Sequence, residues 1–84
     1  MQLNELRKEI DAIDKEMCHL FEKRMNVVKK IGEYKKLHNL PVLDETREKE
    51  VIEKNSSYLL DQSLLSYYQE FLTMLMTLSK KLEK

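Results

Sequence analysis

The sequence predicts an all-α protein with three helices: one long, one short and one C-terminal. Charged residues make up 36% of the 84-residue chain, and it contains one Gly and one Pro. This composition is typical of long helices rather than sheets. Apolar residues recur at alternating spacings of three and four in residues 3–34 and 65–82, which is the period of amphipathic helices. We expect residues 1–84 to form a single domain.

The first helix is predicted to run from about Asn4, as its N-cap, to about Leu37, and Gly32 alone weakens it. Ten positions follow the a/d pattern of a helix that packs against other helices. These seam residues are Leu3, Leu6, Ile10, Ile13, Met17, Leu20, Arg24, Val27, Ile31 and Tyr34. Burying Arg24 costs several kcal/mol unless it is paired. The sequence therefore indicates that Arg24 is either compensated internally or kept for an anion.

The length of this helix predicts a homodimer. Its 34 residues would span roughly 50 Å, whereas a compact chain of this size has a radius of gyration near ~12 Å. The rest of the chain cannot wrap such a rod. We therefore expect a partner protomer to cover part of it.

The second helix is predicted to be short. Pro41 disfavours a helical backbone at the residue before it and so separates the first two helices. Asp44 is a suitable N-cap, and residues 55–57, Asn-Ser-Ser, end the helix.

The third helix is predicted to start at Asp61 or Ser63, either of which can cap it. Its apolar pattern is Leu65, Tyr68, Leu72 and Leu75, continued by Ser79 and Leu82. Ser79 and Glu83 lie one turn apart and extend the inward edge of the helix, so polar groups recur on the inner face here as well.

The charge balance excludes several classes of partner. With 15 basic and 15 acidic residues, there is no broad electrostatic case for binding nucleic acid or an anionic membrane. No stretch approaches the length of a membrane span. Cys18 is the single cysteine, which fits a reducing compartment; we expect it to be partly buried and inert, and the protein to be soluble and cytoplasmic.

Four cations suggest a site for a small dianion. Lys35 lies 11 residues beyond Arg24, so the two share a face of one helix, roughly 16 Å apart. Arg7 lies roughly 25 Å from Arg24 and about 100° round the helix, so it can join only from the partner in a two-fold dimer. Arg47 completes a set suited to a ligand with two carboxylates. The pair Lys80-Lys81 is interpreted as an ordinary solvated face.

At this point the chain resembles a known family, the all-helical class of chorismate mutase. The matching residues, spread over nearly the whole chain, are Leu6-Arg7, Ile10-Asp11, Ile13-Asp14, Leu20, Arg24, Ile31-Gly32, Lys35, Pro41-Val42, Asp44, Arg47-Glu48, Ser79 and Glu83. The resemblance implies an intertwined homodimer of three-helix protomers with two equivalent active sites. It also implies the cofactor-free rearrangement of chorismate to prephenate in aromatic amino acid biosynthesis.

The resemblance also implies a role for each site residue. Arg7 of the neighbouring protomer and Arg24 would bind the substrate carboxylates. Lys35 would donate to the ether oxygen and to a carboxylate. The ring hydroxyl would be held by Glu48 and the Asp44 backbone, and the pocket completed by Arg47 and Ser79.

Glu83 is the residue at which the chain departs from the family pattern. The family has Gln or Glu at this position as the second donor to the ether oxygen. A carboxyl group donates only when protonated, whereas Gln donates at any pH. We therefore expect activity to fall as rising pH removes the proton from Glu83.

Two other functions remain open from the sequence. An isochorismate pyruvate-lyase on the same fold would reuse the cations, although Glu48 suits the hydroxyl of the mutase substrate. A non-catalytic helical dimer could instead regulate a shikimate-pathway enzyme, and such an enzyme is also a possible partner of the mutase.

Overall fold

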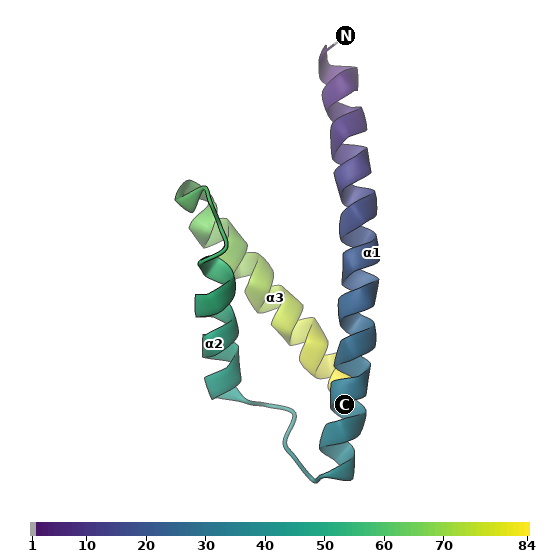
Figure 1. The fold of residues 1–84 in the computed structure, drawn as a ribbon, viewed down its shortest axis with the longest axis vertical. Helices are drawn as coiled ribbons and strands as arrows, with labels where there is room; N and C mark the ends of the chain where they lie inside the picture. The colour runs from purple at the N-terminus through teal and green to yellow at the C-terminus, as the bar shows by residue number, and fades with distance from the viewer. Residues whose placement is uncertain (1) are drawn as a thin grey trace.

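A computed structural model describes residues 2–84, which form three α-helices in an all-helical arrangement (Figure 1). These are α1 (Gln2–Leu37), α2 (Glu45–Ser56) and α3 (Leu65–Glu83), and a 3-10 turn, η1 (Gln62–Leu64), precedes α3. The predicted fold class, one long, one short and one C-terminal helix, is confirmed.

Helix α1 begins two residues earlier than predicted, so Asn4 lies inside the helix rather than at its cap. It ends at Leu37 as predicted. Asn39 has a left-handed backbone, with φ of 55°, and the Leu40 amide donates to the Lys35 carbonyl over 2.8 Å. This is a common helix C-terminal motif, and it turns the chain back toward the last turn of α1.

The capping prediction is right for α2 and wrong for α3. The Asp44 side chain accepts from the Arg47 amide at 3.0 Å and so caps α2. Asp61 accepts from Ser63, but it caps η1, and Leu64 stands at the N-cap of α3. Hydrogen bonds from the Ser63 hydroxyl and then the Ser63 amide lower the pKa of Asp61 below its usual value of 3.8.

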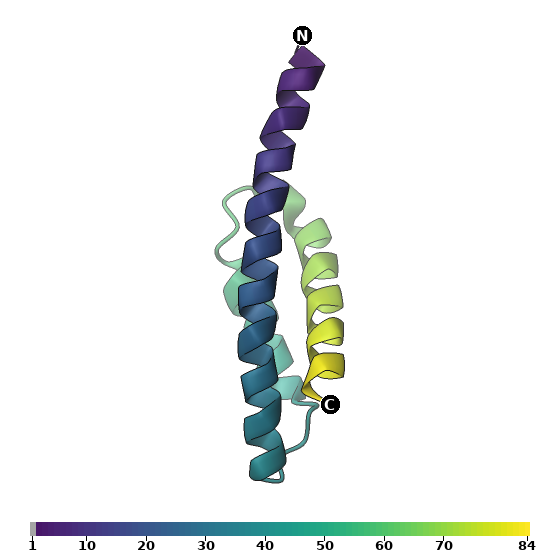
Figure 2. The ribbon, with the colours of Figure 1, turned by 90° about the vertical axis from the view of Figure 1, so that its right-hand side faces the viewer.

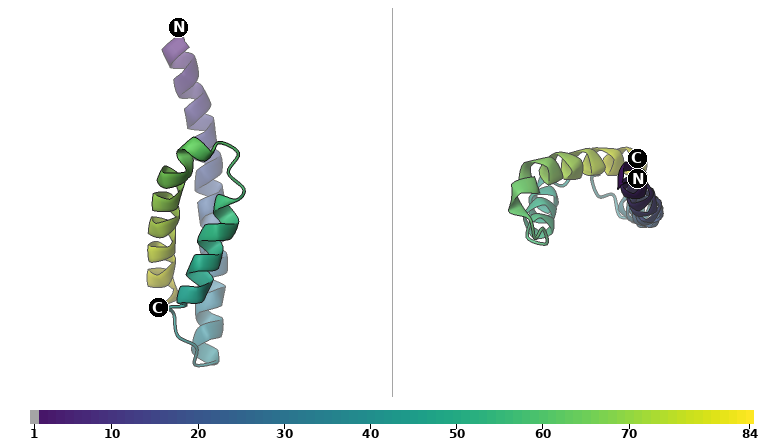
Figure 3. Two further views of the ribbon diagram at one scale, coloured as in Figure 1. Left: turned by 90° about the vertical axis from the view of Figure 1, so that its left-hand side faces the viewer. Right: turned by 90° about the horizontal axis from the view of Figure 1, so that it is seen from above.

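Helix α3 bridges the other two helices. It packs on both α1 and α2, and within residues 2–84 the latter two are not in contact with each other. Seen from above in Figure 3, the three helices therefore form an open arc. Figure 2 shows that the N-terminal part of α1 extends well beyond α2 and α3. The described residues measure 56 × 24 × 16 Å, with a radius of gyration of 15.9 Å.

The contact between α1 and α3 forms the core of the single chain. Buried residues are Met25, Val28 and Gly32 on α1, and Leu72, Ser79 and Glu83 on α3. A Cβ added to Gly32 would lie 2.8 Å from the Glu83 Cα. Glycine at this position therefore lets the two backbones approach closely.

The nine apolar seam residues of α1 are not buried within one chain. Their exposed fractions run from 44% at Ile31 to 63% at Leu20. Helix α3 packs instead on the adjacent stripe that contains Met25 and Val28. The expectation for Cys18 is wrong for the single chain, because this cysteine is exposed.

The inner face of α3 also differs from its predicted pattern at one position. Leu82 remains 38% exposed, whereas Glu83 is 8% exposed. Glu83 follows Ser79 by four residues and stays on the same face of the helix. None of the helices described for residues 2–84 has the length and apolarity needed to cross a membrane.

Candidate active site

A polar cavity of about 230 Å³ lies where the C-terminal halves of α1 and α3 meet the start of α2. Seven of the eight site residues predicted from the sequence line it. They are Arg24, Lys35, Asp44, Arg47, Glu48, Ser79 and Glu83. Apolar walls are supplied by Val28, Ile31, Val42, Val51 and Met76. Helix arithmetic on α1 therefore placed Arg24 and Lys35 correctly on one face.

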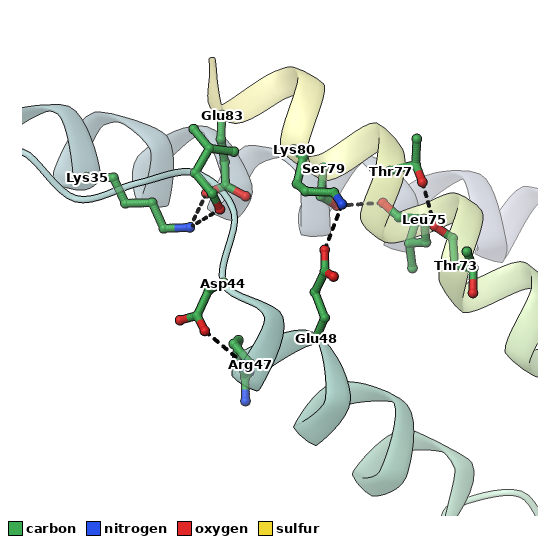
Figure 4. A network of polar contacts seen from close by, with 11 residues as sticks. Lys35, Asp44, Arg47, Glu48, Thr73, Leu75, Thr77, Ser79, Lys80 and Glu83 are labelled. Carbon is green, nitrogen blue, oxygen red and sulfur yellow. Dashed lines mark hydrogen bonds and ion pairs between the residues drawn. The ribbon is translucent and has the colours of Figure 1, made fainter.

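Lys35 is held by two oxygen atoms. Its Nζ atom lies 2.6 Å from Glu83 Oε1 and donates to the Val42 carbonyl over 3.0 Å (Figure 4). The turn at Asn39 brings Val42 back to α1, and Gly32 allows the end of α3 to approach. The side chains of Lys35 and Glu83 are 19% and 9% exposed, respectively. A cation is thus fixed at one end of the cavity.

Arg24 is compensated only by a neutral group. Its NH1 atom donates to Ser79 Oγ over 2.6 Å, and the Ser79 hydroxyl donates in turn to the Leu75 carbonyl over 2.7 Å. Within residues 2–84 no carboxylate forms an ion pair with Arg24. A guanidinium carries five donors, so most of its hydrogen-bonding capacity and its charge remain for an anion.

Arg47 and Asp44 lie at the mouth of the cavity. Arg47 NH1 is 3.5 Å from Glu50 Oε2, and both side chains are about 60% exposed. Such a solvated pair is weak, so Arg47 can turn to a ligand at little cost. The Asp44 carboxylate already caps α2 (Figure 4), which explains its position without any role in ligand binding.

Lys80 is a pocket residue that the sequence analysis missed. It lies 2.8 Å from Glu48 Oε1, and its side chain is 35% exposed, so the solvated interpretation of Lys80-Lys81 is wrong for Lys80. Lys80 comes three residues before Glu83, a spacing that places two side chains on one helix face. That spacing was the available signal, and the neighbouring Lys81 concealed it.

Arg7 is the predicted site residue that lies outside the cavity. It is exposed on the N-terminal part of α1, many turns from Arg24. This agrees with the helix arithmetic, which excluded Arg7 from the site of its own chain. A second chain is needed for Arg7 to reach a pocket.

The arrangement is suited to a small anion. Four cationic and three anionic side chains line the cavity, and two of the carboxylates, Glu48 and Glu83, are each opposed by a lysine. The described residues contain no cluster of three or more metal-binding side chains. Arginine and lysine donors directed into a small pocket bind carboxylates well.

The fold and pocket thus define a helical protein whose cavity, lined by four cationic side chains, is suited to a small carboxylate ligand. Residues 6–84 match the chorismate mutase type II family, and the chain belongs to that family. This confirms the resemblance that the residue pattern suggested.

Two relatives carry related names. The chain is 36% identical over 90 residues to a bifunctional chorismate mutase/prephenate dehydratase of Aquifex aeolicus, an alignment that covers 98% of this chain and 25% of the relative. It is 44% identical over 46 residues to the T-protein of Haemophilus influenzae, covering 55% of this chain and 12% of that protein. The chain thus spans a quarter or less of these relatives. No solved structure matches it.

Proposed function

We propose that this protein is a chorismate mutase, which converts chorismate to prephenate without a cofactor. The observation that carries the proposal is the convergence of Arg24, Lys35 and Arg47 on one cavity that also contains Glu48 and Glu83. Membership of the chorismate mutase type II family supports the same activity. The reaction belongs to aromatic amino acid biosynthesis.

The chemistry requires no covalent intermediate. The enzyme must hold the reactive, chair-like conformer of its substrate and stabilise negative charge that develops on the ether oxygen as the C–O bond breaks. Arg24 and Arg7 of the partner subunit would bind the substrate carboxylates, and Arg47, which is not tied to a buried anion, would complete the pocket with Ser79. Lys35 would donate to the ether oxygen, since the Val42 carbonyl and Glu83 already hold its ammonium group in the cavity.

Glu83 would act as the second donor only in its protonated form. Its Oε1 atom lies 2.6 Å from the Lys35 ammonium, as one partner of an ion pair. Substrate binding would place the ether oxygen between the two groups, so Glu83 must then take up a proton in order to donate. Glu48 would accept a hydrogen bond from the ring hydroxyl, and the Asp44 backbone would complete that contact.

The proposal includes an intertwined homodimer in which Arg7 enters the partner's cavity. The exposed seam of α1 supports it, because contiguous apolar surface of this extent is rare on monomers. A second cavity of about 630 Å³ lies between α1 and α3, is lined mainly by apolar residues such as Met17, Leu20 and Phe71, and reaches Arg24. Packing a second α1 there would bury this surface and bring a partner residue to the edge of the site.

We further propose that the enzyme acts in the cytoplasm, where a single unpaired cysteine, Cys18, is compatible with the reducing conditions. A second enzyme of the same pathway is a possible partner. Its docking would be measured by co-purification with the dimer.

The test of the proposal is the loss of chorismate absorbance with purified protein, together with a mass measurement. We expect prephenate to form and the protein to have twice the mass of the chain. Release of pyruvate from isochorismate without formation of prephenate would replace the mutase with the lyase. A lack of turnover of both substrates would leave the non-catalytic dimer as the better description.

A further inference from the structure

Lys80 forms an ion pair with Glu48 across the gap between α3 and α2 (Figure 4). The two side chains are 35% and 28% exposed, and Glu48 Oε1 is buried. Both residues line the same cavity as Arg24 and Lys35. Resting on the proposed mutase function, we propose that Lys80 is a positioning residue, which holds the Glu48 carboxylate in place to receive the substrate hydroxyl.

The position of Glu48 explains why it needs such a partner. It stands in the first turn of α2, which packs on α3 but not on α1. A Glu side chain has three rotatable bonds and loses considerable entropy when it is fixed. Glu48 Oε1 accepts no hydrogen bond of good geometry from the described residues, so the contact with Lys80 is what fixes this oxygen. The second carboxylate oxygen would then be left to accept from the ligand.

The charge of Lys80 serves the same purpose. A substrate with two carboxylates is repelled by a carboxylate in its own pocket. Lys80 lies 2.8 Å from Glu48 Oε1 and offsets this charge on the side of Glu48 that faces α3. Glu48 can then accept a hydrogen bond without repelling the substrate carboxylates.

A purely structural role for the pair leads to a different expectation. If the pair only links α2 to α3, it contributes little to stability because it is partly exposed. Its loss would then change kcat and KM together, or change neither. If Lys80 positions Glu48, it strengthens the hydrogen bond that the substrate hydroxyl donates to Glu48. That hydrogen bond is present both in the bound substrate and in the transition state. Its loss therefore raises KM and leaves kcat nearly unchanged.

The experiment compares kcat and KM for chorismate in wild type, Lys80→Met, Lys80→Arg, Glu48→Gln and the Lys80→Met/Glu48→Gln double variant. Lys81→Met is the matched control, because Lys81 is the neighbouring lysine, is exposed and does not line the cavity. We expect Lys80→Met to raise KM roughly tenfold, which corresponds to about 1.4 kcal/mol of substrate binding. Lys80→Arg should recover most of this loss, and Lys81→Met should behave as wild type.

The double variant decides whether Lys80 acts through Glu48. If it does, adding Lys80→Met to Glu48→Gln should change KM by less than about twofold, since interacting residues are not additive. A full tenfold effect in that background, or an unchanged KM in Lys80→Met alone, overturns the proposal. Lys80→Gln serves as the second variant if Lys80→Met does not fold. Absence of turnover in wild type would instead refute the mutase function itself, before any variant is compared.

Discussion

In the proposed mechanism, Lys35 is the residue on which the chemistry depends most directly. It is anchored by Val42 and Glu83 at one end of the cavity, and a fixed donor at a developing negative charge is worth more than a mobile one. The last turn of α1 and the turn at Asn39 thus create a preorganised ammonium group. Its neighbour Lys36 is exposed and offers a direct comparison.

Replacing Lys35 with Ala should lower kcat by about 10²–10³-fold, the usual effect of removing one donor from a charge-stabilising site. Lys36→Ala should retain wild-type kcat. Steady-state kinetics with chorismate would measure both variants, after circular dichroism has shown that each remains helical. Similar kcat values in Lys35→Ala and wild type would exclude Lys35 as the donor to the ether oxygen.

The proposed donor role of Glu83 requires a protonated carboxyl group, because a carboxylate cannot donate. The kcat/KM of wild type should therefore depend on pH and fall toward high pH. Glu83→Gln should flatten the profile, since its amide donates at all pH values. A pH series of kcat/KM tests this, and parallel profiles for the two proteins would rule out a donor role for Glu83.

Most of the charged residues that line the cavity could be predicted from the sequence, and the exceptions have physical reasons. The spacing along α1 was sufficient for Arg24 and Lys35 because a helix has a fixed period. The spacing of Lys80 and Glu83 indicated that Lys80 faces the cavity, but its ion pair with Glu48 was not predictable because Glu48 is on another helix. Arg24 donates to the neutral hydroxyl of Ser79, and no carboxylate of residues 2–84 forms an ion pair with it.

At the scale of the elements, the packing of α1 against α3 sets the geometry of the site. Gly32 and Glu83 are in contact through their backbones, so the end of α3 lies against α1 and directs Glu83 to Lys35. The sequence marked Gly32 only as a weak point in a helix. Its actual role depends on which residue of α3 lies opposite, and periodicity within one helix does not contain that information.

Gly32→Ala should destabilise the protein by about 1–2 kcal/mol. The added methyl group would overlap the backbone of α3, which costs about 1–3 kcal/mol, and better helix propensity would return up to about 1 kcal/mol. Urea unfolding measures the change. Asn26→Ala, at an exposed position of the same helix, should be neutral or stabilising. A Gly32→Ala protein as stable and as active as wild type would contradict close packing at this point.

At the scale of the whole molecule, the apolar seam of α1, the longest helix, is not covered by the rest of the chain. The radius of gyration is 15.9 Å, compared with about 12 Å for a compact chain of this length. The predicted length of α1 was enough to indicate that one chain could not cover this helix. It did not predict that α3 would pack on the Met25 stripe and leave the a/d seam exposed, because both stripes are apolar and only the three-dimensional packing distinguishes them.

The proposed dimer makes each site dependent on both protomers, with Arg24 from one and Arg7 from the other. The most direct measurement is therefore the activity of mixed Arg7→Ala and Arg24→Ala proteins, each of which should be nearly inactive alone. After subunit exchange, half of the dimers are mixed and have one intact site, so about a quarter of wild-type activity should return. If exchange is demonstrated by mass and no activity returns, the shared active site is refuted.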